Sequence, residues 1–443
     1  MGRLDRNSLS LKMKPDSRGL AVTTDSDQAI AAINHFTDAA VSLKPGMADI
    51  TAAARREPEC AMLQICAAVL HALSQSNLEA RHGVRYLELA RQRRADLNER
   101  ERNFINAVAA GCDGDFDRAI GVYRQIVERW PRDILAAKLA EFHCFETGDA
   151  GRQLEIMENL AGANGDSPYA LAMYAFALEL NGRREHAEQI SRAALRLDPD
   201  SMWAQHCLAH VYGEQARVSE GIAALKDYAP RWRTFGQYIQ SHNWFHLATL
   251  YLMQLDFDRA LDAYRDHIWG FQSDEIVEHT DAILLLWYVE LAGGKVQERW
   301  REIAPHIRAK AHEQVFPFLT SIYLYALERA GESPEVDRAL AEMEEYARRQ
   351  TGRAAYVWNE IGINQARGLL PEVTFCDGPY ACAEDADAVV IVTEWEEFRA
   401  LDFKRLKGAM AAPVLIDLRN IYRAEEVIGH GFVYHSVGRS SKS

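Results

Sequence analysis

Two pairs of histidines carry the spacing that most directly points to chemistry in this sequence. His206 and His210 lie four residues apart, and so do His242 and His246. Residues at positions i and i+4 lie on the same face of a helix, so each pair presents two imidazoles side by side. Because imidazole binds transition metals when neutral and also forms hydrogen bonds, the two pairs are candidates for a binding site.

Three roles fit these histidines, and the sequence alone leaves all three open. Histidines that line a groove donate hydrogen bonds to the backbone of a bound ligand, which is the role we favour. Buried histidines bonded to carbonyl groups are the second role, and a zinc or similar ion, with or without hydrolytic chemistry, is the third. We therefore predict a ligand groove with no catalytic residue, no metal ligand and no cofactor. The predicted groove residues are His206, His210, His242, His246, Asp281 and Glu214.

The elements that must position these residues recur with a period of 34 residues. Ala119, Ala187 and Gly221 fall in one register with that period, and Pro131 and Pro199 share a second place in it. This is the length of the tetratricopeptide repeat, a pair of helices that pack closely through small side chains. The 13 prolines and 27 glycines among 443 residues are few, as expected of long helices joined by short turns.

The register predicts a mostly α fold, with a tetratricopeptide-type α-solenoid over residues 25–368 after an N-terminal segment, residues 1–24. The histidine pairs fall in the first helices of two successive repeats, and Asp281 falls early in the next first helix. First helices line the concave side of such a solenoid. We therefore expect the histidines, Asp281 and Glu214 to face one groove.

Composition excludes several classes of function. The net charge is −14, from 64 acidic and 50 basic residues, which argues against a nucleic-acid partner. No apolar stretch approaches the roughly 18 residues needed to span a bilayer, and no secretory signal is expected. The seven cysteines are scattered without a CxxC pair, which favours free thiols in a reducing cytoplasm.

The repeat region contains three distinctive segments, Asp16–Leu20 followed by Thr23–Thr24, Trp203–His210 and Ser241–His246. They resemble the tetratricopeptide repeat protein 38 family, and the resemblance covers residues 16–368. It implies the fold and no established chemistry. It also implies a polar Asn-Asp-Ala-His run in a later helix, where this chain has Leu319–Ile322, so a site that needs that run is incomplete here.

The last part of the chain has a different pattern. Ala388–Thr393, Pro413–Asp417 and Phe432–His435 are short apolar runs, which are typical of strands buried in a parallel sheet. Glu396–Lys407 between the first two runs is predicted to be a crossover helix. These residues predict a small C-terminal α/β, partial Rossmann-like fragment that begins near Leu370.

The fragment contains four distinctive segments, Leu370–Asp377, Asp387–Trp395, Ile416–Tyr422 and Gly431–Gly438. In these segments it resembles the C-terminal, UDP-binding domain of UDP-glucose 6-dehydrogenase, over residues 369–439. The resemblance implies that Arg419 contacts the nucleotide sugar. Residues 440–443 are expected to form a disordered tail.

Two parts of the dehydrogenase machinery are missing from the sequence. The chain has no GxGxxG turn for a dinucleotide and no Gly-Gly-Ser-Cys-Phe-Pro-Lys segment for the thiolate nucleophile. We therefore expect no hydride transfer and no NAD. The predicted function is an interaction module that binds a peptide, protein or small ligand in the groove. We predict no membrane partner. The alternatives are UDP-sugar binding through Arg419 and a metal-assisted hydrolase that uses the histidines. A homodimer through the uncapped end of the solenoid is also open.

Overall fold

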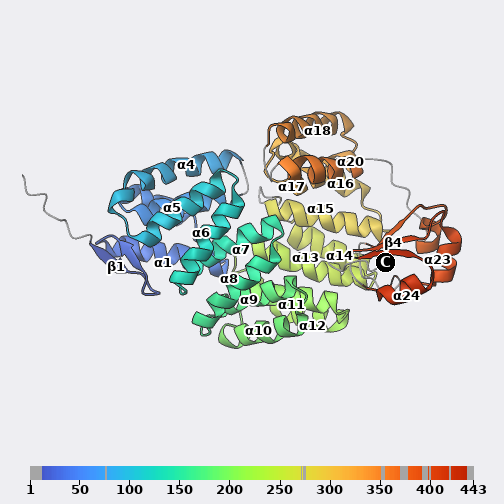
Figure 1. Cartoon of the computed structure of the whole chain (residues 1–443), viewed down its shortest axis with the longest axis horizontal. Helices are drawn as coiled ribbons and strands as arrows, with labels where there is room; N and C mark the ends of the chain where they lie inside the picture. Colours follow the sequence, from blue (N-terminus) through green and yellow to red (C-terminus); the bar gives the residue numbers. More distant parts are fainter. Residues whose placement is uncertain are drawn as a thin grey trace, which may run out of the picture. The chain divides into compact units, whose positions relative to one another are not determined.

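The chain forms two compact units, Met1–Leu370 and Pro371–Ser443, which are described separately. Helices make up nearly all of the first unit, and the second contains a small sheet (Figure 1). The computed structural model describes residues 12–74, 77–270, 272, 276–350, 355–369, 378–391, 398, 401–418 and 421–436.

The first unit is built from antiparallel helix pairs. Along the chain, the unit begins with the four helices α1 (Asp27–Ser42), α2 (Asp49–Arg56), α3 (Ala61–Ala72) and α4 (Asn77–Gln92). The first helices of the later pairs, called the A helices below, are α5 (Glu99–Cys112), α7 (Ile134–Thr147), α9 (Pro168–Leu180), α11 (Met202–Glu214), α13 (Gln237–Met253), α15 (Ile276–Leu291) and α17 (Pro317–Ala330). Their partners, the B helices, are α6 (Phe116–Arg129), α8 (Ala150–Ala163), α10 (Arg184–Leu197), α12 (Val218–Trp232), α14 (Phe257–Ala263), α16 (Gln297–Ile307) and α18 (Ser333–Arg348).

The predicted register is confirmed by the packing of the small residues. Ala119 and Ala187 on the B helices and Ala248 on α13 are fully buried. A side chain at Gly221 on α12 would place its Cβ 2.8 Å from atoms of Tyr212 and Leu250, so only glycine allows this close approach. From α7 to α17, each A helix contacts the next A helix as well as its B partner.

The two helix types differ in how much of their surface they bury. The A helix α9 is buried on most sides, from Ala170 to Glu179. Its partner α10 is amphipathic and buries only Ala187, Ser191 and Ala194. The A helices therefore form an inner row that is covered by the B helices, as the repeat predicts.

The N-terminal segment predicted to precede the solenoid is part of its packing. Strands β1 (Met13–Pro15) and β2 (Ala21–Thr23) form an antiparallel hairpin. The carboxylate of Glu101 on α5 accepts a hydrogen bond of 2.8 Å from the Thr23 N–H. Next to it, the buried Arg100 pairs with Asp133 at 2.8 Å and donates to the Ala21 carbonyl. These contacts fasten the described part of the segment to α5 and α7.

The last helix of the unit takes the place of a further A helix. It is a π-helical turn, η4 (Val357–Gly362), continued by α20 (Ile363–Leu369), and it packs on α17 and α18. Trp358 and Ala366 are buried, and Asn359 donates a 2.9 Å hydrogen bond to the Ala347 carbonyl. Tyr356 and Ile361 are exposed at this end of the solenoid. The homodimer through this end stays a prediction.

The second unit contains the predicted parallel sheet. Strands β3 (Val389–Ile391), β4 (Val414–Asp417) and β5 (Val433–Ser436) are parallel and adjacent in that order. Helices α21 (Pro379–Cys382), α23 (Phe403–Ala409) and α24 (Ala424–Gly429) accompany them. The predicted crossover helix, residues 396–407, is confirmed only in its second half, because most of its first half lies outside the described residues. The tail at 440–443 lies outside them as well.

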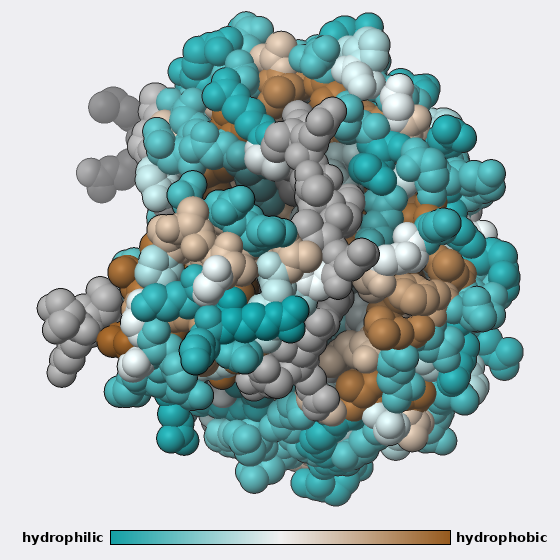
Figure 2. Space-filling model, turned by 90° about the vertical axis from the view of Figure 1, so that its right-hand side faces the viewer, coloured by the Kyte–Doolittle hydropathy of each residue, from teal (hydrophilic) through white to brown (hydrophobic). Residues whose placement is uncertain are grey.

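The face drawn in Figure 2 is mostly polar. Hydrophilic side chains cover most of the face in Figure 2, and hydrophobic ones form separate small patches. Among the described helices, none is both long enough and apolar enough to cross a membrane.

Candidate functional site

The two histidine pairs meet side by side on adjacent A helices. His206 and His210 project from α11, and His242 and His246 project from α13, which contacts α11 directly. The Nε2 atom of His206 lies 3.1 Å from that of His210 and 3.1 Å from that of His242. The Nε2 atoms of His242 and His246 are 3.2 Å apart. One ring nitrogen from each of the four residues falls within 4.8 Å of all the others. We call these four residues the histidine centre.

Two buried carboxylates hold the outer nitrogens of this centre. Asp281 on α15 lies 2.9 Å and 3.2 Å from Nδ1 of His242 through its two oxygens. Glu179 on α9 lies 3.5 Å from Nδ1 of His210. Four consecutive A helices, α9, α11, α13 and α15, thus contribute to one site.

Aromatic rings enclose the centre on its protein side. The indole of Trp203 stacks on His206 with centroids 4.7 Å apart and planes 10° from parallel. Phe245 stacks on His242 in the same way at 5.9 Å, and Phe176 lies 5.2 Å from the His206 ring. Trp203 and Phe245 are buried, as expected of packing residues.

Burial is uneven across the centre. His206 is only 2% exposed, whereas the side chains of His210 and His242 are 26% and 24% exposed. The centre is therefore closed at His206 and reaches solvent on the side of His210 and His242.

Burial and neighbouring charges shift the ionisation of these groups. Burial, followed by repulsion from the other imidazoles, lowers the pKa of His206 and of His246 well below the usual range. Burial also acts to lower the pKa of His210, but the hydrogen bond and charge of Glu179 outweigh it and raise that pKa. Burial raises the pKa of Asp281, and His242 partly offsets the rise. These shifts favour the neutral form of His206 and of His246. A neutral imidazole is the form that can bind a metal.

The centre leaves polar atoms without partners. Nδ1 of His206 is buried and makes no hydrogen bond within the described part of the chain, and neither does Oε2 of Glu179. Buried polar atoms normally find a partner, and each exception requires an explanation.

A row of aromatic rings continues from the centre in both directions along the A helices. Phe145 on α7 contacts Phe176 on α9 at 6.0 Å, and Phe176 contacts Trp203 on α11 at 5.4 Å. On the other side Phe245 on α13 contacts Tyr288 on α15 at 6.1 Å. We call these five rings, together with the histidine centre between them, the ring stripe. Its two ends are exposed, Phe145 by 59% and Tyr288 by 37%.

The structure brings five of the six predicted groove residues together. Glu214 is the exception: it ends α11 and pairs with Arg184 on α10, although its charge still reaches His210. Sequence reasoning missed Glu179 and Phe176. Both lie in the A helix before the first histidine pair, at positions where only the packing of α9 on α11 reveals their role. Arg419, the predicted nucleotide-sugar contact, lies outside the described residues.

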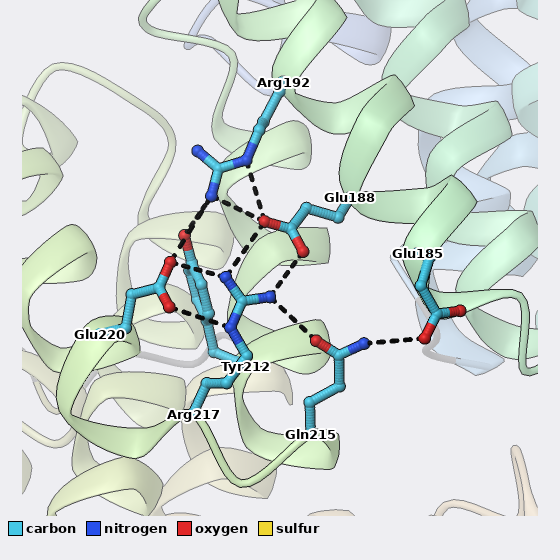
Figure 3. A network of polar contacts seen from close by, with 7 residues as sticks. All are labelled: Glu185, Glu188, Arg192, Tyr212, Gln215, Arg217 and Glu220. Carbon is cyan, nitrogen blue, oxygen red and sulfur yellow. Dashed lines mark hydrogen bonds and ion pairs between the residues drawn. The ribbon is translucent and has the colours of Figure 1, made fainter.

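A second cluster of charged residues lies on α10, α11 and α12 (Figure 3). Arg217 donates to the carboxylates of Glu188 and Glu220, at 2.6 Å in each case. Arg192 shares Glu188 at 2.7 Å and donates to the Tyr212 hydroxyl at 3.1 Å. We call these residues the arginine network. Each of its charges is paired with an opposite charge. The network is therefore a set of structural ion pairs that connects the helices.

Comparison with known proteins identifies relatives for the end of the chain. Residues 346–424 match the UDP-glucose/GDP-mannose dehydrogenase family, UDP binding domain. A UDP-glucose 6-dehydrogenase of Rhizobium meliloti is 56% identical over 78 residues, which are 18% of this chain and 18% of that protein. The chain thus spans about a fifth of the length of the curated relatives it matches.

The family match begins earlier than the predicted fragment. It begins at residue 346, whereas the dehydrogenase-like fragment was predicted to begin at 369 and the first compact unit ends at Leu370, so the predicted boundary stays a prediction. The helix at Val357–Leu369 therefore belongs to the matched stretch by sequence but packs on α17 of the first unit.

Solved structures with similar helices include a thermophilic TPR protein of Thermus thermophilus, which is 19% identical with a TM-score of 0.35 and covers 42% of this chain and 99% of that one. Another is a monomeric mutant of IFIT1 with Gppp-AAAA, 13% identical with a TM-score of 0.38, covering 77% of this chain and 87% of that one. By the order and contacts of its own helix pairs, the first unit is a tetratricopeptide-like helical repeat, and with the small parallel sheet of the second unit the predicted fold class is confirmed. Membership of the tetratricopeptide repeat protein 38 family and a cytoplasmic location stay predictions.

Proposed function

We propose that this chain is a helical-repeat binding protein whose ligand, a peptide or a small molecule with apolar groups, lies along the ring stripe. The observation that carries the proposal is the continuity of ring contacts across five consecutive A helices, from Phe145 to Tyr288. Aromatic rings provide large contact area at low entropic cost, and they dominate the energetics of binding surfaces.

The distribution of exposed rings supports this choice of surface. Phe145 and Tyr288, at the two ends of the stripe, are both exposed and both lie on A helices. The overall charge of −14 disfavours nucleic acid as the ligand. The histidines do not serve as free donors to a peptide in this proposal, because their Nε2 atoms face one another. The exposed rings at the two ends, Phe145 and Tyr288, are left to hold the ligand, and the buried rings between them keep these ends in place.

A matched set of variants tests the proposal. Peptides selected from a random display library on the purified chain would be measured by fluorescence anisotropy. Phe145→Ala and Tyr288→Ala are expected to weaken binding about tenfold each, since each removes an exposed anchor ring. Leu197→Ala, at a similarly exposed position on the B helix α10, is expected to change it by less than about twofold. Equal losses in all three variants would contradict the proposal.

The second unit supports a narrower conclusion. We infer that it carries out no hydride transfer, since the matched family region covers only residues 346–424 and the sequence has no GxGxxG turn. UDP-sugar binding remains the alternative for this unit. Calorimetry of the full chain with millimolar UDP-glucose and with NAD is expected to give no heat of binding, and saturable heat with UDP-glucose would establish the alternative.

A further inference from the structure

We propose that the histidine centre binds one divalent transition-metal ion through the four Nε2 atoms of His206, His210, His242 and His246. The sequence favoured hydrogen bonding to a ligand for these residues, and the geometry favours a metal. The proposal does not depend on the ring stripe binding a peptide or small molecule.

The spacing of the nitrogens is that of a coordination shell. Zinc binds imidazole nitrogen at about 2.0–2.1 Å in a tetrahedron, which places neighbouring ligand nitrogens about 3.3 Å apart. The three Nε2 separations, 3.1 Å, 3.1 Å and 3.2 Å, lie close to that edge length. All four nitrogens lie within 4.8 Å of one another, so small rotations of the rings bring the remaining edges into range.

The carboxylates fix the tautomers that a metal requires. Asp281 accepts the proton on Nδ1 of His242, and Glu179 is placed to accept that of His210. A neutral imidazole protonated at Nδ1 presents a lone pair at Nε2. Carboxylates that orient metal-bound histidines in this way are the usual surroundings of such sites.

Hydrogen bonds among the histidines do not account for the cluster. With lone pairs on Nε2 of His210 and His242, the single Nε2 proton of His206 would have to serve two acceptors at 3.1 Å. Nδ1 of His206 would then be a buried acceptor with no partner among the described residues. Converging lone pairs and an unsatisfied buried nitrogen are costly in the protein alone, and a shared cation removes the conflict among the lone pairs.

The donor set selects the class of ion. Imidazole suits zinc, copper, nickel and iron, whereas magnesium and calcium require oxygen ligands. Four protein nitrogens fill a tetrahedral shell, which is the arrangement of structural zinc sites and leaves no position for a hydrolytic water. Asp281 and Glu179, each placed behind a ligand, supply the two negative charges that balance a divalent ion. The partly exposed side at His210 and His242 gives the ion a path of entry.

The consequence for the solenoid is a cross-link between two repeats. One ion would join α11 to α13 directly and would draw in α9 and α15 through Glu179 and Asp281. The site is complete without the Asn-Asp-Ala-His run that Leu319–Ile322 replaces, because none of the four nitrogens comes from α17.

Competition titration of the full chain with Zn²⁺ and a chromophoric chelator tests the proposal. The metal-stripped wild type is expected to bind one equivalent of Zn²⁺ with submicromolar affinity and to bind neither Mg²⁺ nor Ca²⁺. His210→Gln and His242→Gln are each expected to weaken zinc binding at least about a hundredfold, since each removes one of four ligands. His186→Gln, which removes an imidazole from α10, serves as the matched control and is expected to leave it unchanged.

Two outcomes would overturn the proposal: a wild type that leaves all the zinc on the chelator, or a loss in His186→Gln as large as in His210→Gln. Circular dichroism of each variant controls for folding. Because His210 and His242 are each about a quarter exposed, their replacement by glutamine is expected to preserve the helical signal. Should one variant unfold, the other and the wild-type stoichiometry still decide the question.

Discussion

The histidine centre and the arginine network are two polar clusters held by neighbouring repeats, and they differ in one respect that matters. In the arginine network, cations and carboxylates alternate, so that Arg217 is satisfied by Glu188 and Glu220 (Figure 3). In the histidine centre, four groups of one kind bring their Nε2 atoms close together. Complementary groups bind each other and need nothing more. Like groups that converge form a site for a ligand of opposite character.

Ionisation follows the same division. The hydrogen bond from Arg217 lowers the pKa of Glu188, so folding reinforces the charge that this residue carries at neutral pH. Burial and mutual repulsion lower the pKa of His206 and His246, so folding opposes their charge. A shift that strengthens a group's ordinary charge indicates a structural pair. A shift that opposes the charge of two neighbouring bases, as at His206 and His246, is not explained by an ion pair between them.

The largest effect outside the four ligands is expected at Asp281. Asp281→Asn keeps the size of the side chain but weakens its hold on the Nδ1 proton of His242. Removing such a partner typically costs about 10–100-fold in metal affinity. Chelator competition would measure the change. Glu214→Gln is the matched control, since Glu214 pairs with Arg184 outside the centre, and an equal loss in both variants would show that the effect is general electrostatics.

A smaller effect is expected in the arginine network. Arg217→Met keeps much of the side-chain volume and removes the ion pairs to Glu188 and Glu220. Because these groups are partly exposed, the pair with Glu188 is expected to contribute less than about 1 kcal/mol to the free energy of unfolding, measured by urea denaturation. Zinc affinity should not change. A change in zinc affinity without a change in stability would contradict the structural role that we assign to the arginine network.

The stability difference between the wild type and Arg217→Met is expected to depend on pH. Glu188 has a folded pKa below its ordinary value of 4.5, so its contribution is complete above that value and is lost as the pH falls through the folded pKa. The stability difference between the wild type and Arg217→Met should therefore be constant from about pH 7 to about pH 5 and shrink below that. A difference that persists in full at about pH 3 would exclude the ion pair as its source.

The sequence was sufficient to predict the repeat and the two histidine pairs, and the reason is local. Small residues at fixed places, such as Ala119 and Gly221, and the i, i+4 spacing of His242 and His246 are visible within single helices. Which helices meet is a property of packing. The role of Glu179, on the A helix before that of His210, follows only from the contact of α9 with α11. The tautomers also depend on that contact, and so the choice between a peptide donor and a metal ligand required the structure.

Zinc K-edge X-ray absorption of the purified full chain, loaded with one equivalent of Zn²⁺, tests the central claim most directly. The account predicts four nitrogen neighbours at about 2.0 Å with the outer-shell scattering of imidazole rings, and loss of that pattern in His242→Gln. Coordination by sulfur or mainly by oxygen, or an unchanged spectrum in His242→Gln, would contradict it.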